Sequence, residues 1–474
     1  MLQRCTGRAV ACLTSHDAKC CRIHTPSASL KRSLIPDKFT KVCFARDIMK
    51  SLIKKLKRSS LLSGAGVYFG TSVINASIPF FMLPVLTRFL EPSEYGEVAV
   101  FTVWVSLISA ICGLSVHGAA ARKYYDFEDP DEHIGEFTTA CLLLLISSTL
   151  VVLLVILPLA PWISGILGLS KQWVVVGVGF AFCNFLISLR MGQWQVRKEP
   201  LKYGSFQISR SILDVSLSLM LVVSLTLGVT GRITGMTAAA MLFAAIALHL
   251  LYRDGLIKRS WRPDYMKEAA SFGVPLIPHI LGAFLLLTID RAVIGAVLGL
   301  ESAGFYMVAA QIAGILNIVL DSFNKAYVPW LYERLKQDQR DEKLFVVKLT
   351  YIYYLALLVI AGVAFLFGGS FLTLVAGESY APAAEIVAWL VLGQCFRGMY
   401  LMVTSYIFYA RRTKYLAMVT ISSGILNIVI MFPLLQYYGV LGAAYAFCIS
   451  MFLQFVFVAL VARRLVSMPW GLKV

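Results

Sequence analysis

Ionisable residues occur inside long apolar stretches of this sequence, where they could bind a charged ligand. Arg397 lies near the middle of the apolar run 383–408, with Gln394 one helical turn before it. A charged side chain at that depth of a bilayer is costly unless it faces protein or water. Because the planar guanidinium matches phosphate oxygens, the position predicts an anion site or an aqueous cavity. An ion pair with Glu385 or Asp290 is the alternative.

Further ionisable residues follow the same reasoning on other apolar runs. Two pairs of opposite charge are spaced four residues apart and share a helix face, Arg210 with Asp214 and Asp321 with Lys325. Each pair could contact a ligand or tie helices together as an internal ion pair. Arg88 and Arg190 lie nearer the ends of their runs, where they could reach the headgroups. Helical spacing also predicts a polar stripe of Gln311, Asn317, Asp321 and Asn324.

The elements that position these residues are predicted to be transmembrane helices. Hydrophobic residues make up 58% of the 474 and charged residues only 15%, which excludes an ordinary soluble enzyme. Only helices and closed barrels satisfy their backbone hydrogen bonds in lipid, and runs of about 20 apolar residues favour helices. Twelve spans are predicted, at roughly 64–90, 95–121, 136–158, 172–194, 203–228, 232–252, 270–298, 303–325, 347–368, 383–408, 415–435 and 439–462.

The distribution of Lys and Arg predicts the orientation of these spans. The loops on the side of the N-terminus hold 25 basic residues, and the opposite loops hold only Lys171 and Arg232. Basic loops stay in the cytoplasm, so both termini are predicted to be cytoplasmic. We therefore interpret the net charge of +17 as a signal of membrane topology and not of nucleic-acid binding.

No residues with the spacing of a catalytic, nucleotide-binding or metal site are apparent. The ten Cys have no metal-ligand spacing, and no phosphate-binding loop motif occurs, so we expect no cofactor and no metal. Residues 1–48 carry nine Lys or Arg and five Cys but no apolar run of signal-peptide length. We interpret them as a disordered extension or a misassigned start ahead of Met49, with a genuine cytoplasmic tail as the alternative.

An internal repeat predicts two related halves. The segment from Leu90 to Gly96 resembles the segment from Leu298 to Gly304, 208 residues later, and 212–215 resembles 425–428. Six spans separate the matched elements, so the halves point the same way, as parallel repeats do. We therefore predict two six-helix bundles, 49–255 and 256–474. Prolines at matching places kink the first and seventh spans and are candidate hinges: Pro79, Pro84, Pro275 and Pro278.

Three motifs resemble those of bacterial polysaccharide and O-antigen flippases. They are Pro84-x-x-Thr-Arg88-x-Leu90-x-Pro-x-x-Tyr95-Gly96, Asp290-Arg291-x-x-Ile294 followed by Gly299, Gly304, Tyr306 and Ala309, and Tyr438-Gly-Val-x-Gly442-Ala-Ala444. The resemblance covers about residues 58–464. It implies the fold of MATE-type extruders and lipid-linked peptidoglycan precursor flippases, with two bundles around a central cavity.

The resemblance also implies the substrate, a polyprenyl-pyrophosphate-linked oligosaccharide flipped across a bacterial inner membrane for surface polysaccharide such as lipopolysaccharide or exopolysaccharide. In this hypothesis Arg397 and Arg291 bind the pyrophosphate, Asp290 orients Arg291, and aromatics such as Trp389 meet the sugars. Membrane lipid, a polysaccharide polymerase and chain-length proteins are the expected partners. The candidate substrate-binding residues are Arg397, Arg291, Asp290, Arg88, Arg210, Asp214, Asp321, Lys325, Tyr306 and Tyr400.

Two other classes of function stay open at this point. A cation-coupled drug extruder of the same fold would favour a carboxylate-rich cavity, so Arg397 argues against it. A membrane glycosyltransferase or ligase acting on lipid-linked sugars would need a large outer loop with catalytic groups. The longest predicted outer loops, 159–171 and 369–382, are short, and their one acidic residue is Glu378.

Overall fold

The chain is a multi-pass membrane protein built from helices. A computed structural model describes residues 60–127, 130–410, 412 and 414–471, and the proposed extension 1–48 lies outside them. Within the described residues there is no strand, and twelve helices are long and apolar enough to cross a membrane. The twelve predicted spans are therefore confirmed in number and in approximate place.

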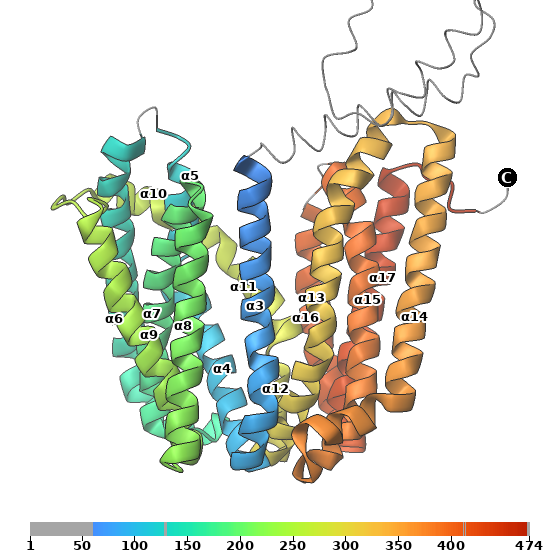
Figure 1. Ribbon diagram of the computed structural model, residues 1–474, viewed down its shortest axis with the longest axis horizontal. Coiled ribbons are helices and arrows are strands. Elements are labelled where there is room, and N and C mark those ends of the chain that lie inside the picture. Colours follow the sequence, from blue (N-terminus) through green and yellow to red (C-terminus); the bar gives the residue numbers. More distant parts are fainter. Residues whose placement is uncertain (1–59, 128–129, 411, 413, 472–474) are drawn as a thin grey trace, which may run out of the picture. The chain divides into compact units, whose positions relative to one another are not determined.

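The helices follow the chain in the order shown in Figure 1. Their bounds are α3 Ser60–Phe89, α4 Pro92–Cys112, α5 Val116–Lys123, α6 Pro130–Leu167, α7 Lys171–Val196, α8 Pro200–Leu219, η1 Met220–Ser224, α9 Gly228–Arg253, α10 Pro263–Gly273, η2 Val274–Leu276, α11 Ile277–Leu287, α12 Asp290–Leu298, α13 Leu300–Gln337, α14 Arg340–Ala376, η3 Glu378–Ala383, α15 Ala384–Tyr409, α16 Lys414–Tyr438 and α17 Val440–Leu465.

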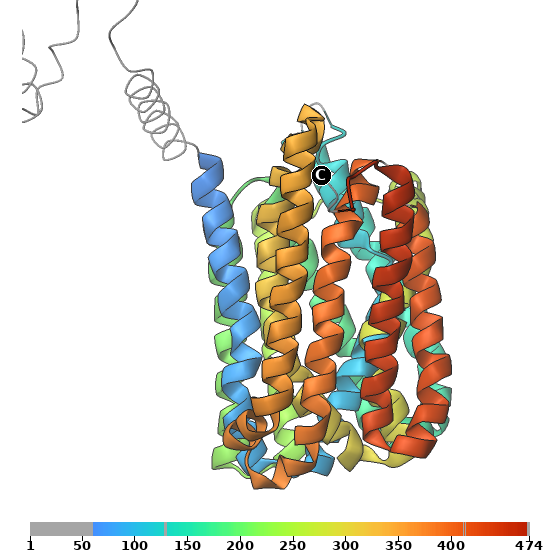
Figure 2. The same cartoon turned by 90° about the vertical axis from the view of Figure 1, so that its right-hand side faces the viewer.

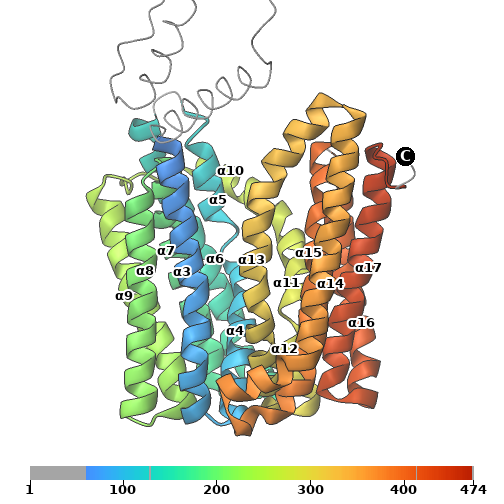
Figure 3. The ribbon, with the colours of Figure 1, turned by 45° about the vertical axis from the view of Figure 1, so that its right-hand side comes forward.

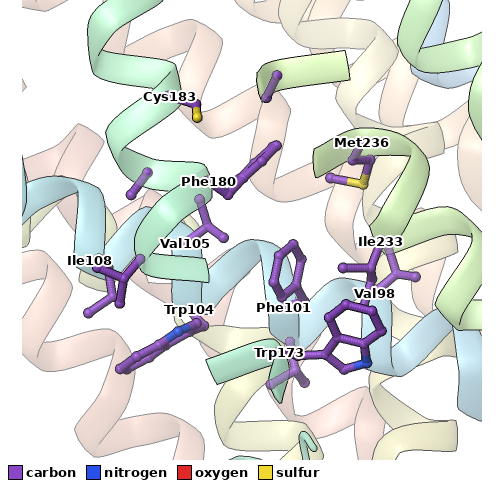
Figure 4. Close-up of a cluster of buried hydrophobic side chains, with 14 of the residues drawn as sticks. Val98, Phe101, Trp104, Val105, Ile108, Trp173, Phe180, Cys183, Ile233 and Met236 are labelled. Carbon is purple, nitrogen blue, oxygen red and sulfur yellow. The ribbon is translucent and has the colours of Figure 1, made fainter. Parts of the chain in front are cut away.

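Helices α4 to α9 pack against one another and form what we call the N-terminal group. Its core is apolar, with side chains of α4, α7 and α9 meeting in the cluster shown in Figure 4. Phe101 on α4 lies edge-on to Trp173 on α7, with 6.4 Å between the ring centroids. The indole of Trp104 donates a hydrogen bond to the Val174 carbonyl at 2.9 Å, which satisfies its only buried donor.

Helices α11 and α13 to α17 form the C-terminal group, whose helices α14, α15 and α17 run side by side in Figure 2. The two groups meet where α4 crosses α13. Gly96 and Gly304 lie at this crossing, and a Cβ on Gly96 would be 1.7 Å from the Leu300 carbonyl oxygen. Only glycine permits backbones to approach this closely, so the repeated motif places a glycine from each half at one contact.

Two predicted spans are less regular than the sequence suggested. The predicted span 270–298 is broken twice, first at the 3₁₀ turn η2 that contains Pro275 and again between α11 and α12 at 288–289. Figure 3 shows α10, α11 and α12 as successive segments of this broken span. The predicted span 95–121 ends at Cys112, because Leu114 and Ser115 adopt positive φ values of 40° and 48° before α5 begins. By contrast, α3 continues through both of its prolines.

Candidate functional site: charged cavities between the helices

A cavity of about 250 Å³ lies among α11, α12, α13, α15 and α17 in the C-terminal part of the chain. It brings together five of the residues predicted from the sequence to bind substrate. Its charged and polar lining residues are Asp290, Arg291, Tyr306, Asn317, Asp321, Gln394 and Arg397. Because they converge from three helices, α12, α13 and α15, this cavity is the first candidate for an anion site.

Arg397 is held at this cavity by two residues of α13. Its Nη1 donates to the Asn317 side-chain oxygen at 2.6 Å, and its Nη2 donates to Asp321 Oδ1 at 3.2 Å. The Arg397 side chain is 21% exposed and that of Asp321 is 47% exposed. The predicted partners Glu385 and Asp290 were wrong, and so was the pairing of Asp321 with Lys325. The guanidinium is fixed in orientation while part of it still faces the cavity.

Asp290 is buried in a network of uncharged groups. Tyr306 donates its hydroxyl to one carboxylate oxygen at 2.6 Å, and Asn427 donates its amide to the other at 3.0 Å. Ser450 on α17 extends the network by donating to the Asn427 oxygen at 3.4 Å. Asp290 thus joins α12, α13, α16 and α17, and its orientation of Arg291 stays a prediction.

Among the described residues, Arg291 forms no ion pair with a carboxylate, since both oxygens of Asp290 are bonded to neutral groups. Its Nε is buried and has no hydrogen-bond partner among the described residues. An unsatisfied buried donor on a cation is costly, and an oxyanion in the cavity would remove that cost. Of the charged groups in this cavity, Arg291 is the one whose geometry most favours an anionic ligand.

A second cavity, of about 370 Å³, lies between α3 and α13. It shares Asn317 and Asp321 with the first cavity and is lined by Pro79 on the α3 side. Lys325 and Gln311, both predicted as polar residues of the eighth span, also line it. The two cavities thus share lining residues on α13, and Gln311, Asn317 and Asp321 of the predicted polar stripe line one or both of them.

The largest of these cavities, about 640 Å³, lies between α3 and the helices α5, α7 and α8 of the N-terminal group. It contains Arg210 and Asp214, which do not bond to each other as the sequence suggested. Arg210 donates to the side-chain oxygen of Asn184 on α7, whereas Asp214 accepts a bond from Arg232 on α9 at 2.6 Å. The predicted i,i+4 pairing is wrong because each side chain finds a partner on a neighbouring helix.

Several predicted residues lie outside these cavities. Arg88 is exposed near the end of α3, and Tyr400 packs against the hydrophobic cluster that contains Tyr327 and Tyr406. Trp389 lies edge-on to Phe365 and Tyr445, with ring centroids 5.1 and 4.7 Å apart.

Arg190 is 1% exposed and forms an ion pair with Asp254, while its guanidinium lies 4.2 Å from the centre of the Trp194 ring. Its buried guanidinium is thus held by groups of the protein. Burial alone would raise the pKa of Asp254, but the hydrogen bond from Arg253 and the charge of Arg190 outweigh this and hold that pKa below its usual value.

Sequence reasoning missed Asn427 and Arg232 as parts of these networks. A signal for Asn427 was available, because in the internal repeat it occupies the place that Asp214 has in the first half. Both positions carry a polar side chain that faces the interior of its half. Arg232 was assigned to an outer loop, but α9 begins four residues earlier, at Gly228.

A twelve-span all-helical fold with charged internal cavities defines the class of polytopic membrane proteins to which transporters belong. The family model described as "Polysaccharide biosynthesis protein" matches residues 61–335, more than half of the chain. The chain belongs to this family, which confirms the resemblance found in the sequence.

Two similar curated proteins come from Haemophilus influenzae. One, "Uncharacterized membrane protein", is 26% identical over 77% of this chain and 88% of its own length, and the other, "Lsg locus putative protein 1", is 22% identical over 80% and 94%.

Solved structures confirm the fold that the resemblance implied. The inward-facing conformation of a multidrug resistance MATE family transporter of the MOP superfamily matches with a TM-score of 0.64 and 14% identity, covering 82% of this chain and 94% of that chain. The lipid II flippase MurJ in its inward closed conformation matches with a TM-score of 0.63 and 13% identity, covering 82% and 87%. The chain therefore has the fold shared by these flippases and transporters.

Proposed function

We propose that the protein flips a polyprenyl-pyrophosphate-linked oligosaccharide from the inner to the outer leaflet of a bacterial inner membrane, for surface polysaccharide biosynthesis. The main supporting observation is that Arg291 and Arg397 line one internal cavity and that the buried Nε of Arg291 has no hydrogen-bond partner among the described residues. A pyrophosphate brings oxygens that can accept bonds from both guanidinium groups. Membership in the polysaccharide biosynthesis family supports a saccharide as the rest of the substrate.

The cavity between α3 and α13 supports a route for the lipid tail. Its lining combines apolar residues such as Phe80 and Ile318 with the polar residues that it shares with the cavity of Arg397. A substrate could keep its polyprenyl chain beside α3 while its headgroup lies inside the protein. This arrangement avoids moving a charged, hydrated glycan through a hydrocarbon layer about 30 Å thick.

Alternating access completes the proposal. The glycines at the crossing of α4 and α13 keep one end of the molecule closed, on the side that the loop charges assign to the outside. Opening this contact while the other end closes would move the headgroup between leaflets, as rocking of one half against the other does in related folds. Both termini then lie in the cytoplasm, and a polymerase and chain-length proteins on the opposite, outer side would receive the product.

Reconstitution in vesicles tests this function directly. Purified protein should move a fluorescent polyprenyl-pyrophosphate disaccharide between leaflets, and Arg291→Gln should reduce the rate by about tenfold or more, the loss for a charge-assisted hydrogen bond. Lys202→Gln is the matched control, because Lys202 is 60% exposed and its removal leaves the cavities unchanged. Transport of cationic dyes without transport of the lipid-linked sugar would instead support the drug extruder, which shares this fold.

A further inference from the structure

Arg210, on α8 of the N-terminal group, is a second cation that forms no ion pair with a carboxylate among the described residues. Its hydrogen-bond partner among the described residues is the neutral side chain of Asn184, and the nearest acid on its own helix, Asp214, is bonded to Arg232. Four other buried or half-buried arginines among the described residues each bond a carboxylate. The pairs are Arg190 with Asp254, Arg232 with Asp214, Arg334 with Glu342, and Arg397 with Asp321. The charge of Arg210 is thus available to the cavity that it lines.

Neutral hydrogen-bonding groups surround Arg210 in this cavity of about 640 Å³. Asn75 accepts a hydrogen bond from Ser211 at 2.5 Å, so these two side chains already satisfy each other. Gln207 Oε1 and His117 Nδ1 are buried and have no hydrogen-bond partner among the described residues. Burial lowers the pKa of His117, so this imidazole is neutral at pH 7 and can donate or accept. Unsatisfied buried polar atoms favour a ligand that carries hydroxyl groups.

The position of the cavity links it to the proposed substrate path. Pro79 on α3 lines both this cavity and the cavity between α3 and α13, which in turn shares Asn317 and Asp321 with the cavity of Arg291. A headgroup bound in the C-terminal cavity could therefore extend past Pro79 into the N-terminal one. The two cavities would bind different parts of one elongated molecule.

We propose that the N-terminal cavity holds an acidic sugar of the glycan, with its carboxylate on Arg210 and its hydroxyls on Gln207 and His117. This inference rests on the proposed function and adds the substrate class to it. The pyrophosphate occupies Arg291 and Arg397, so the carboxylate is a second anionic group at a separate place. Arg210 then determines specificity for a charged over a neutral repeat unit, because a fully neutral sugar would leave the guanidinium without a counter-ion.

A pair of matched substrates tests the inference. Both are polyprenyl-pyrophosphate disaccharides, one ending in glucuronic acid and the other in glucose, and the measurement is the ratio of their initial flipping rates in vesicles. Wild type should move the acidic substrate about tenfold faster, and Arg210→Gln should bring the ratio close to one. Arg210→Lys should retain part of the preference because it keeps the charge. Arg291→Gln should slow both substrates and leave the ratio unchanged.

The outcomes separate this inference from the proposed function. Two results would overturn the inference without affecting the proposed flipping function. One is equal flipping rates for both substrates in wild type. The other is a ratio of rates that falls to one in Arg291→Gln but not in Arg210→Gln. If wild type moves neither substrate, the proposed function is wrong, and the acidic-sugar site is then tested by ligand binding alone. In that case purified wild type should still be stabilised against thermal unfolding by a free glucuronate disaccharide more than by the glucose analogue. If Arg210→Gln loses this difference in stabilisation, the result supports the proposed site. If wild type shows no such difference, the result refutes the site.

Discussion

Replacing Gly304 with alanine should push the protein toward the conformation that is open to the outside. A Cβ at this position would lie 1.9 Å from the Pro92 carbonyl oxygen on α4. Carbon and oxygen normally approach to about 3.3 Å, so the two helices must separate by about 1.4 Å. Overpacking of this kind costs about 1–3 kcal/mol. If that cost falls only on the outer-closed state, the equilibrium shifts by about 5- to 150-fold.

Cysteine labelling measures this shift. Met307 lines a small cavity of about 60 Å³ next to the crossing, together with Tyr95 and Gln311, whose side chains form a hydrogen bond of 2.9 Å between α4 and α13. In a cysteine-free background, Met307→Cys should react slowly with an impermeant maleimide added to intact cells. Adding Gly304→Ala should accelerate the reaction by at least fivefold, because the contact that covers Met307 is opened.

The matched control uses the same substitution on the same helix. A Cβ on Gly314 would meet no atom within 4 Å, so Gly314→Ala should leave the labelling rate of Met307→Cys unchanged. Protein abundance is measured for each variant, because loss of folding would also expose the cysteine. If a normally abundant Gly304→Ala variant labels like the parent, or if Gly314→Ala labels equally fast, the crossing is not the outer closure.

Three further predictions concern single residues. Asp254→Asn leaves the buried Arg190 without its carboxylate, so it should cost about 3–5 kcal/mol of folding free energy and lower the melting temperature in detergent by several degrees. Asp264→Asn, at an exposed position, should not lower it. Because the pKa of Asp254 is depressed, the stabilisation by its carboxylate is present at neutral pH and is lost as the pH falls through that depressed pKa. Arg397→Ala should abolish transport with near-normal abundance, since the Asp321 side chain left behind is 47% exposed, and loss of the protein would show a structural role instead. Glu378→Cys should react with an impermeant reagent in intact cells, and a failure to react would overturn the topology.

The span count and the depth of Arg397 could be predicted because they depend on local sequence alone. Apolar runs of bilayer length must form helices, and α15 places Arg397 fourteenth among its 26 residues. The breaks near 113–115 and 288–289 could not be predicted in the same way. They depend on backbone conformations that neighbouring helices impose, as when Phe185 occupies the space where a side chain on Gly113 would lie.

The partners of the charged residues were harder to predict than their positions. Spacing of four residues suggested pairs within one helix, but a pair of this kind is worth only a few tenths of a kcal/mol in water. Inside the protein each charge instead bonds the best-placed group on another helix, so Asp214 meets Arg232 and Asp321 meets Arg397. The partner of each charge depends on how whole helices pack together, and this packing cannot be predicted from the sequence of one helix.

The internal repeat contains both the glycines at the crossing of α4 and α13 and the polar residues of the networks within each half. Gly96 and Gly304 occupy equivalent places in the repeat and meet each other directly at the crossing of α4 and α13. Asp214 and Asn427 are also equivalent, yet each stays within its own half, Asp214 with Arg232 and Asn427 with Asp290. A contact between equivalent small residues can open without leaving an unpaired polar group, whereas the networks keep each half rigid. This division of roles is what movement of two halves as rigid bodies requires.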